Sequence, residues 1–127
     1  MSIARVMLVD DDPDIRFIAE LSLSRIGGWE VVLASSGPEA LVALEREQPD
    51  VLLLDMVMPG MDGAAVMRAL QQDEALRGLP VIFLTGKAQD HELAQYLALG
   101  AAGLIEKPFD PMTLPALVTE IVAGRRP

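Results

Sequence analysis

The chain has 127 residues, a formal net charge of -9 and no cysteine. The length suits one domain with one hydrophobic core, and a hydrophobic content of 51% is typical of a globular protein. The lack of cysteine excludes disulfides, thiolate metal sites and a cysteine nucleophile. The acidic balance argues against direct nucleic-acid binding, which depends on Lys and Arg. Because the first apolar run is too short for a signal peptide or a membrane span, we expect a cytoplasmic protein without membrane attachment.

Short apolar runs alternate with longer segments of helical periodicity along the chain. Each run has about the length of a strand, and most lack strict alternation. This pattern is expected of strands that are covered on both faces of a parallel sheet. The runs occupy residues 4–10, 29–35, 50–55, 80–85 and 102–107.

The first three helix candidates begin at capping residues. Asp12-Pro13 supplies an N-cap and a first helical residue, and Gly27-Gly28 ends that helix. Ser36 and Glu39 have the S-x-x-E spacing of a capping box before the second helix. The third helix follows Asp62, which we interpret as its cap.

The last two helix candidates have apolar faces of different quality. The fourth spans about 89–99 and carries three residues on one face: Leu93, Tyr96 and Leu97. The fifth has a regular stripe: Leu114, Leu117, Val118, Ile121 and Val122. Pro115 leaves two starts open for the fifth helix. Either Asp110 is the N-cap and Pro115 removes one backbone bond, or the helix begins near Thr113.

Five strand-helix units in series predict an α/β fold with a doubly wound parallel sheet and helices on both faces. The chain shows no internal repeat or interdomain linker. We therefore expect a single domain over 1–127, with a folded core of about 3–123. Residues 124–127 are expected to form a tail or the start of a linker.

Polar side chains follow four of the predicted strands where each strand ends. The first strand ends at Asp10 and Asp11, the third at Asp55, the fourth at Thr85 and the fifth at Lys107. Sites in open parallel sheets form beyond the carboxyl ends of the strands, so these groups are expected at one edge. Taken singly, each has a simpler interpretation: a helix cap, the end of a strand, a turn hydroxyl or a surface amine.

The chemistry of this group points to phosphoryl transfer. Clustered carboxylates repel one another, and a divalent cation removes that cost. Mg²⁺, or Mn²⁺, binds a few carboxylates together with water and phosphate oxygens. A carboxylate such as Asp55 can act as a nucleophile and form an aspartyl phosphate. The transfer then needs mainly positioning and charge neutralisation, to which Lys107 and the Thr85 hydroxyl can contribute.

Four motifs together resemble the receiver domain of two-component response regulators. They are Val9–Arg16, Asp50–Gly63, Pro80–Gly86 and Gly100–Phe109, and the resemblance covers essentially the whole chain. It implies a flavodoxin-like (βα)5 fold with a five-stranded parallel sheet in the order 2-1-3-4-5. It also implies a phosphoprotein that is not an enzyme, although it assists its own phosphorylation and dephosphorylation.

The resemblance also assigns roles to individual residues. Asp55 matches the phosphoacceptor. Asp10 and Asp11 match the acidic pair that holds Mg²⁺, with Asp11 as the direct ligand, and the Val57 backbone carbonyl matches a further ligand. Thr85 matches the switch hydroxyl. Lys107 matches the invariant amine, and the bond from it to Pro108 is cis in the family.

Three positions depart from the family pattern or add to it. Leu104 stands where relatives often have an aromatic ring that changes rotamer, so the coupling from Thr85 is expected to use Leu104 packing instead. Val57 stands where relatives often have a polar side chain. Lys87 lies two residues after Thr85 and could reach the phosphoryl group. We expect Val57 and Lys87 to tune the lifetime of the phosphoryl group.

The partners that the resemblance implies are proteins of a phosphorelay. A histidine kinase or a histidine phosphotransfer protein donates the phosphoryl group, and an output domain or target protein binds the face of the fourth helix, fifth strand and fifth helix. A homodimer through that face is also allowed.

Three other functions are possible for a chain with this pattern. An aspartyl-nucleophile phosphatase of the haloacid dehalogenase type needs an acid where Val57 stands. A flavin or nucleotide module needs a glycine-rich loop where this chain has acids. A receiver that binds partners without phosphorylation stays open.

Overall fold

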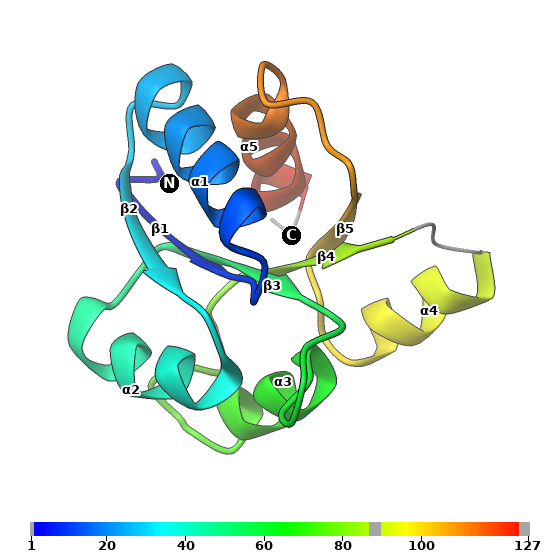
Figure 1. The fold of residues 1–127 in the computed structure, drawn as a ribbon. Coiled ribbons are helices and arrows are strands. Elements are labelled where there is room, and N and C mark those ends of the chain that lie inside the picture. Colours follow the sequence, from blue (N-terminus) through cyan, green and yellow to red (C-terminus); the bar gives the residue numbers. More distant parts are fainter. Residues whose placement is uncertain (1, 87–89, 125–127) are drawn as a thin grey trace.

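The computed structural model describes residues 2–86 and 90–124 as one α/β layer structure (Figure 1). The parallel strands are β1 (Arg5–Val9), β2 (Glu30–Ala34), β3 (Val51–Asp55), β4 (Val81–Thr85) and β5 (Gly103–Glu106). They form a sheet in the order β2-β1-β3-β4-β5, as the resemblance implied. Lys87 and the expected start of the fourth helix at Gln89 lie outside the described residues.

Helices cover both faces of the sheet. They are α1 (Pro13–Leu21), α2 (Gly37–Glu47), α3 (Gly63–Gln71), α4 (Asp90–Ala98) and α5 (Leu114–Gly124), with a π-helical segment, Ser22–Ile26, that continues α1. Figure 1 shows α1 and α5 together on one face, and α2 and α3 on the other. None of the helices in the described part of the chain is long and apolar enough to cross a bilayer.

The central strand β3 explains why the strand runs are apolar without alternation. Leu52 and Leu54 pack into the core beneath α2 and α3, whereas Val51 and Leu53 pack into the core beneath α1 and α5. Successive side chains of a strand point to opposite faces, so a strand covered on both sides must be apolar throughout. Asp55 is the exception at the end of this run.

The predicted caps are present, with one correction. The side chains of Asp12, Ser36 and Asp62 accept hydrogen bonds from backbone amides in the first turns of α1, α2 and α3. The Glu39 carboxylate accepts from the Ser35 amide rather than from Ser36, so the expected capping box is shifted by one residue. Gly27 ends the first helical segment as predicted, although the last part of that segment is π-helical.

The structure shows which residues of α4 pack against the sheet and where α5 begins. On α4, Tyr96 packs against Phe83, with ring centroids 5.5 Å apart, whereas Leu97, predicted on the same face of the helix, is 46% exposed. Helix α5 begins at Leu114, which favours the later of the two predicted starts. Pro115 therefore lies in the first turn, where its missing N–H would have no helical partner.

A candidate phosphoacceptor site at the strand ends

The carboxyl ends of β1, β3 and β4 deliver three buried polar side chains to one edge of the sheet. Asp10 is 0% exposed, Asp55 is 3% exposed and Thr85 is 7% exposed. Among the described residues, Ser22 is the only other buried polar or charged side chain. Buried carboxylates are costly unless they are paired, so their concentration here sets this edge apart from the rest of the molecule.

Asp10 is held by hydrogen bonds at each of its polar atoms. Its amide donates to the Ala34 carbonyl at 3.2 Å, and its Oδ1 accepts from the Asp12 amide at 2.9 Å. Its Oδ2 lies 3.1 Å from Lys107 Nζ, and its carbonyl accepts from Arg16 Nη1 at 2.7 Å. This carboxylate is therefore fixed in place before any ligand arrives.

Lys107 joins two of the acids through one ammonium group. Its Nζ donates to Asp10 Oδ2 at 3.1 Å and to Asp55 Oδ1 at 3.2 Å. Burial alone would lower the pKa of Lys107, but the hydrogen bonds and charges of Asp10 and Asp55 outweigh it and raise the pKa. The ammonium stays charged and partly neutralises the two buried carboxylates.

The pKa of Asp55 is raised to about 6. The largest cause is burial, which disfavours the charged carboxylate, and the nearby Asp10 carboxylate raises the pKa further. Lys107 and the Val57 amide, which donates to Asp55 Oδ1 at 3.3 Å, act in the opposite direction without cancelling the rise. Asp55 is thus under electrostatic strain that an additional cation would relieve.

Three carboxylates fit a hard divalent cation. One oxygen from each of Asp10, Asp11 and Asp55 lies within 4.8 Å of the others, and Asp11 is exposed at the rim. Carboxylate oxygens are the ligands that Mg²⁺ takes in proteins, usually with several waters retained. The donor set and the unrelieved repulsion at Asp55 therefore both suit Mg²⁺.

The loop after Asp55 is tightly seated on the strand end. The Gly63 amide donates to the Met56 carbonyl at 3.0 Å. A Cβ at position 63 would lie 2.7 Å from the Asp55 carbonyl oxygen and 2.9 Å from Met56 Cα. Val57, by contrast, projects from the loop and is 79% exposed.

Thr85 and Leu104 lie on the strands that lead toward α4 and α5. The Lys107 amide donates to the Thr85 carbonyl at 2.6 Å, which links the end of β4 to the residue that reaches Asp55. Leu104 is half-buried and stands opposite Phe83 in the β4–β5 register. The bond from Lys107 to Pro108 is cis, as the resemblance implied.

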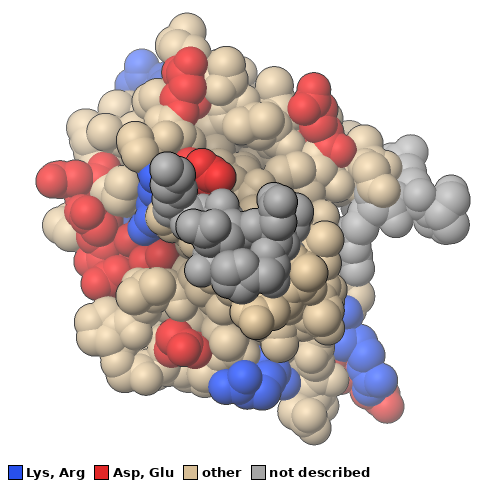
Figure 2. All heavy atoms as spheres, turned by 90° about the vertical axis from the view of Figure 1, so that its right-hand side faces the viewer, with Lys and Arg blue, Asp and Glu red and all other residues tan. Residues whose placement is uncertain are grey.

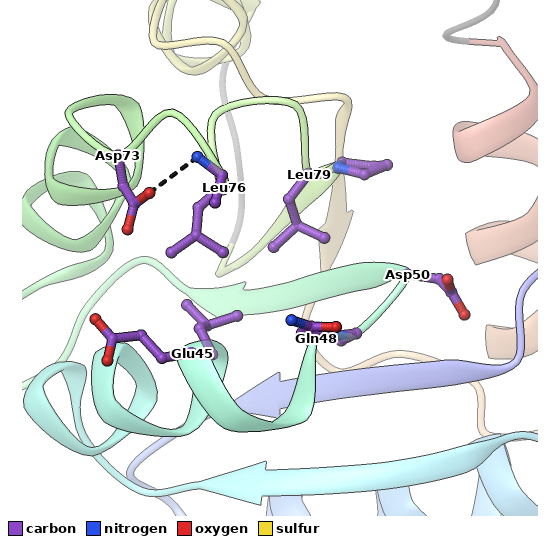
Figure 3. A pocket seen from close by; sticks show the side chains of 10 residues that line it. Glu45, Gln48, Asp50, Asp73, Leu76 and Leu79 are labelled. Atoms are coloured by element: carbon purple, nitrogen blue, oxygen red, sulfur yellow. Dashed lines mark hydrogen bonds between the residues drawn. The ribbon is translucent and has the colours of Figure 1, made fainter.

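Figure 2 shows acidic side chains gathered on the left of its view, with basic ones beside them. A cavity of about 570 Å³ lies at the opposite, amino-terminal edge of β3 and β4. Figure 3 shows its leucine side chains between α2 and the α3–β4 connection, with Glu45 and Asp73 at its side. None of the residues at the acidic edge lines this cavity, so its volume says nothing about the chemistry there.

The comparisons with known proteins agree with this geometry. Residues 6–119 match the family described as the response regulator receiver domain. The chain belongs to this family. It is a receiver domain of two-component response regulators, and such domains typically bind Mg²⁺ at an acidic cluster like that of Asp10, Asp11 and Asp55.

Solved receivers have the same fold. The Vibrio cholerae chemotaxis protein CheY4 is 31% identical, with a TM-score of 0.87 over 94% of this chain and 99% of that chain. The receiver domain of a histidine kinase from Syntrophus aciditrophicus is 29% identical, with a TM-score of 0.82 over 97% of this chain and 92% of that chain.

Curated relatives include transcriptional regulators. The alkaline phosphatase synthesis transcriptional regulatory protein PhoP of Bacillus subtilis is 35% identical over 93% of this chain and 48% of its own length. The DNA-binding response regulator MtrA of Mycolicibacterium smegmatis is 36% identical over 90% of this chain and 48% of its own length. The chain thus spans about half the length of these relatives.

Arg16 also reaches this edge, although no pattern in the sequence assigns it a role. Its side chain reaches back from α1 to the Asp10 carbonyl. The sequence offered only a weak signal, since Arg16 stands four residues after the Asp12 cap and an arginine there could equally extend into solvent.

Proposed function

We propose that this receiver accepts a phosphoryl group on Asp55 from a phosphohistidine and so acts as a switch in a phosphorelay. The observation that carries the proposal is the arrangement around Asp55. A buried carboxylate with a raised pKa lies at an open sheet edge, bridged by Lys107 to Asp10 and within reach of Asp11. In this proposal the domain is a phosphoacceptor that assists the transfer, not an enzyme with turnover on a separate substrate.

The transfer is an exchange of one bond to phosphorus for another. A carboxylate oxygen of Asp55 bonds to phosphorus as the phosphorus–nitrogen bond of the donor breaks. The imidazole leaves with that electron pair and takes up a proton. The Lys107 ammonium would donate to one phosphoryl oxygen, and the Thr85 hydroxyl at the end of β4 to another.

Asp11, Asp55 and the Val57 carbonyl are the proposed Mg²⁺ ligands. Both carboxylate oxygens of Asp10 already accept hydrogen bonds from the protein, which favours Asp11 over Asp10 as the direct ligand. When bound, Mg²⁺ would neutralise the charge that gathers on the phosphoryl oxygens.

The output follows from where the contacts lie. Contacts to Thr85 and Lys107 would pull on the ends of β4 and β5, and Leu104 packing would carry the change toward α4 and α5. Phosphorylation would thus shift an existing equilibrium of the α4-β5-α5 face. An output domain, a target protein or a second copy would bind that face.

The phosphodonor is proposed to dock on the apolar surface of α1 beside the acidic edge. Phe17 is 62% exposed, and Ile18 and Leu21 are also exposed along this helix. Met112, in the loop between β5 and α5, is 70% exposed. Ile18 and Leu21 line one apolar pocket together with Pro111, which precedes Met112 in the chain. Contiguous exposed apolar side chains mark interaction sites, and the phosphodonor protein would cover them.

The proposal is tested with a small-molecule phosphodonor. The protein is incubated with acetyl phosphate and Mg²⁺, and its intact mass is measured. We expect the mass of one added phosphoryl group in the wild type and in Asp62→Asn, a nearby acid, but not in Asp55→Asn or in wild type with EDTA. No added mass in the wild type would refute the proposal.

A further inference from the structure

Arg16 forms a clamp on the loop that carries the acidic pair. Its backbone amide donates to the Asp12 carbonyl at 3.1 Å as part of α1, and its side-chain Nη1 donates to the Asp10 carbonyl at 2.7 Å. One residue on the helix thus holds both ends of the Asp10–Asp12 segment. The guanidinium is half-buried, so this bond is partly shielded from water.

The Asp10 carbonyl oxygen, which Arg16 holds, lies directly before Asp11 in the chain. The Asp10 carbonyl belongs to the peptide group that leads into Asp11, so its orientation sets the path of the chain there. The Asp10 side chain is fixed independently by the Asp12 amide and by Lys107. Asp11 is exposed, so the direction of its carboxylate depends on how firmly this peptide is held.

We propose that Arg16 is a positioning residue for the divalent cation, because its hydrogen bond to the Asp10 carbonyl holds the Asp11 carboxylate toward Asp55. This role rests on the proposed function, since it concerns the cation that the phosphoacceptor site would use. Residues that orient metal ligands from behind commonly change metal affinity by about 10-fold or more when they are replaced.

A simpler role for Arg16 predicts the opposite sign. If the guanidinium were only a positive charge near three carboxylates, it would repel a divalent cation, and its removal would strengthen Mg²⁺ binding. If it positions the loop, its removal weakens Mg²⁺ binding even though the site becomes more negative. The direction of the change therefore separates the two roles.

The experiment is a calorimetric Mg²⁺ titration of the protein without phosphodonor. Arg16→Met keeps the aliphatic stem and removes the donors, and we expect about 10-fold weaker binding. Arg25→Ala is the matched control, because Arg25 lies nine positions farther along the same helical layer, and its affinity should equal that of the wild type. Thermal unfolding in EDTA checks that each variant is folded. If Arg16→Met does not fold, Arg16→Gln, which is too short to reach the Asp10 carbonyl, replaces it with the same expected loss.

Affinity in Arg16→Met that equals or exceeds that of the wild type would overturn the positioning role. Mass measurement with acetyl phosphate keeps this outcome separate from the proposed function. If the wild type gains the phosphoryl mass while Arg16→Met binds Mg²⁺ normally, only the positioning role fails. If the wild type binds Mg²⁺ and gains no mass, the phosphoacceptor function fails, and the role of Arg16 is still decided by the titration.

Discussion

The Lys107 ammonium lies 3.2 Å from Asp55 Oδ1, so the end of β5 is joined to the end of β3 across the intervening strand β4. The same ammonium contacts Asp10 at the end of β1. Three strand ends are thus held together by one charge. Removing that charge would leave two buried carboxylates facing each other.

Lys107→Met should lower the free energy of unfolding in EDTA by about 1–2 kcal/mol. Breaking a buried ion pair costs more than breaking a surface pair, and the open edge of the sheet reduces the full effect. Urea unfolding measures the loss. The double variant with Asp55→Asn is the control, and the loss should be smaller there because only one of the two carboxylates remains. An equal loss in both backgrounds would show that the ion pair with Asp55 contributes nothing to stability.

Asp55→Asn should stabilise the metal-free protein at neutral and alkaline pH. The pKa of Asp55 is raised from 3.8 in its ordinary state to about 6 in the folded protein, so the fold favours the protonated carboxyl group. The wild type therefore loses stability as the pH rises through this window, and an asparagine does not. We expect an advantage of about 1–2 kcal/mol at pH 8, after allowance for solvent screening at the open edge.

The advantage of Asp55→Asn should shrink as the pH falls through about 6 and be gone below about 4. Thermal unfolding in EDTA across this range measures it. Glu120→Gln, which removes an exposed acid on α5, serves as the control for the loss of one negative charge. An advantage that increased toward acid pH would contradict the sign of the pKa shift.

Val57→Asn should shorten the lifetime of phosphorylated Asp55 several-fold. The Val57 side chain lies exposed at the rim and cannot hydrogen-bond an attacking water, whereas an asparagine amide can orient one. Loss of the phosphoryl mass after removal of the donor gives the rate, and Val57→Ala is the apolar control. Lys87→Ala should also change this rate. Unchanged rates in both Val57→Asn and Lys87→Ala would refute the tuning role of these positions.

Thr85→Ala should uncouple phosphorylation from the change in the α4-β5-α5 face. We expect Asp55 still to gain the phosphoryl group, more slowly, because one donor to a phosphoryl oxygen is lost. Amide chemical shifts of β5 and α5 should then move less than in the wild type, and Thr85→Ser, which keeps the hydroxyl, should restore most of the movement. If the amide chemical shifts in Thr85→Ala change as much as in the wild type, the Thr85 hydroxyl has no part in the switch.

The sequence predicted the sheet and the position of its acidic edge because both follow from simple periodicities. Strands covered on both faces must be apolar, so Asp55 stood out at the end of its run. Parallel strands also end at the same edge, which placed Thr85 and Lys107 near it. Strand order came from the resemblance and not from these patterns.

Side-chain contacts were harder to predict because several partners lie within reach of each long side chain. Glu39 bonds the Ser35 amide, one residue from the predicted partner. Leu97 fitted the same helical stripe as Tyr96, yet Leu97 is 46% exposed, whereas Tyr96 packs against Phe83. Arg16 was missed for the same reason, since its partner is a backbone carbonyl that no sequence pattern marks.

Gly63 packs tightly against the backbone of Asp55, whereas Val57, in the loop between these two residues, does not. A Cβ at Gly63 would lie 2.7 Å from the Asp55 carbonyl oxygen, so either the backbone of Asp55 or the start of α3 would have to shift. The Val57 side chain faces outward, so it can be exchanged without moving Asp55. In the proposed function, exchange of the Val57 side chain would change the lifetime of the phosphoryl group without moving the residue that carries it.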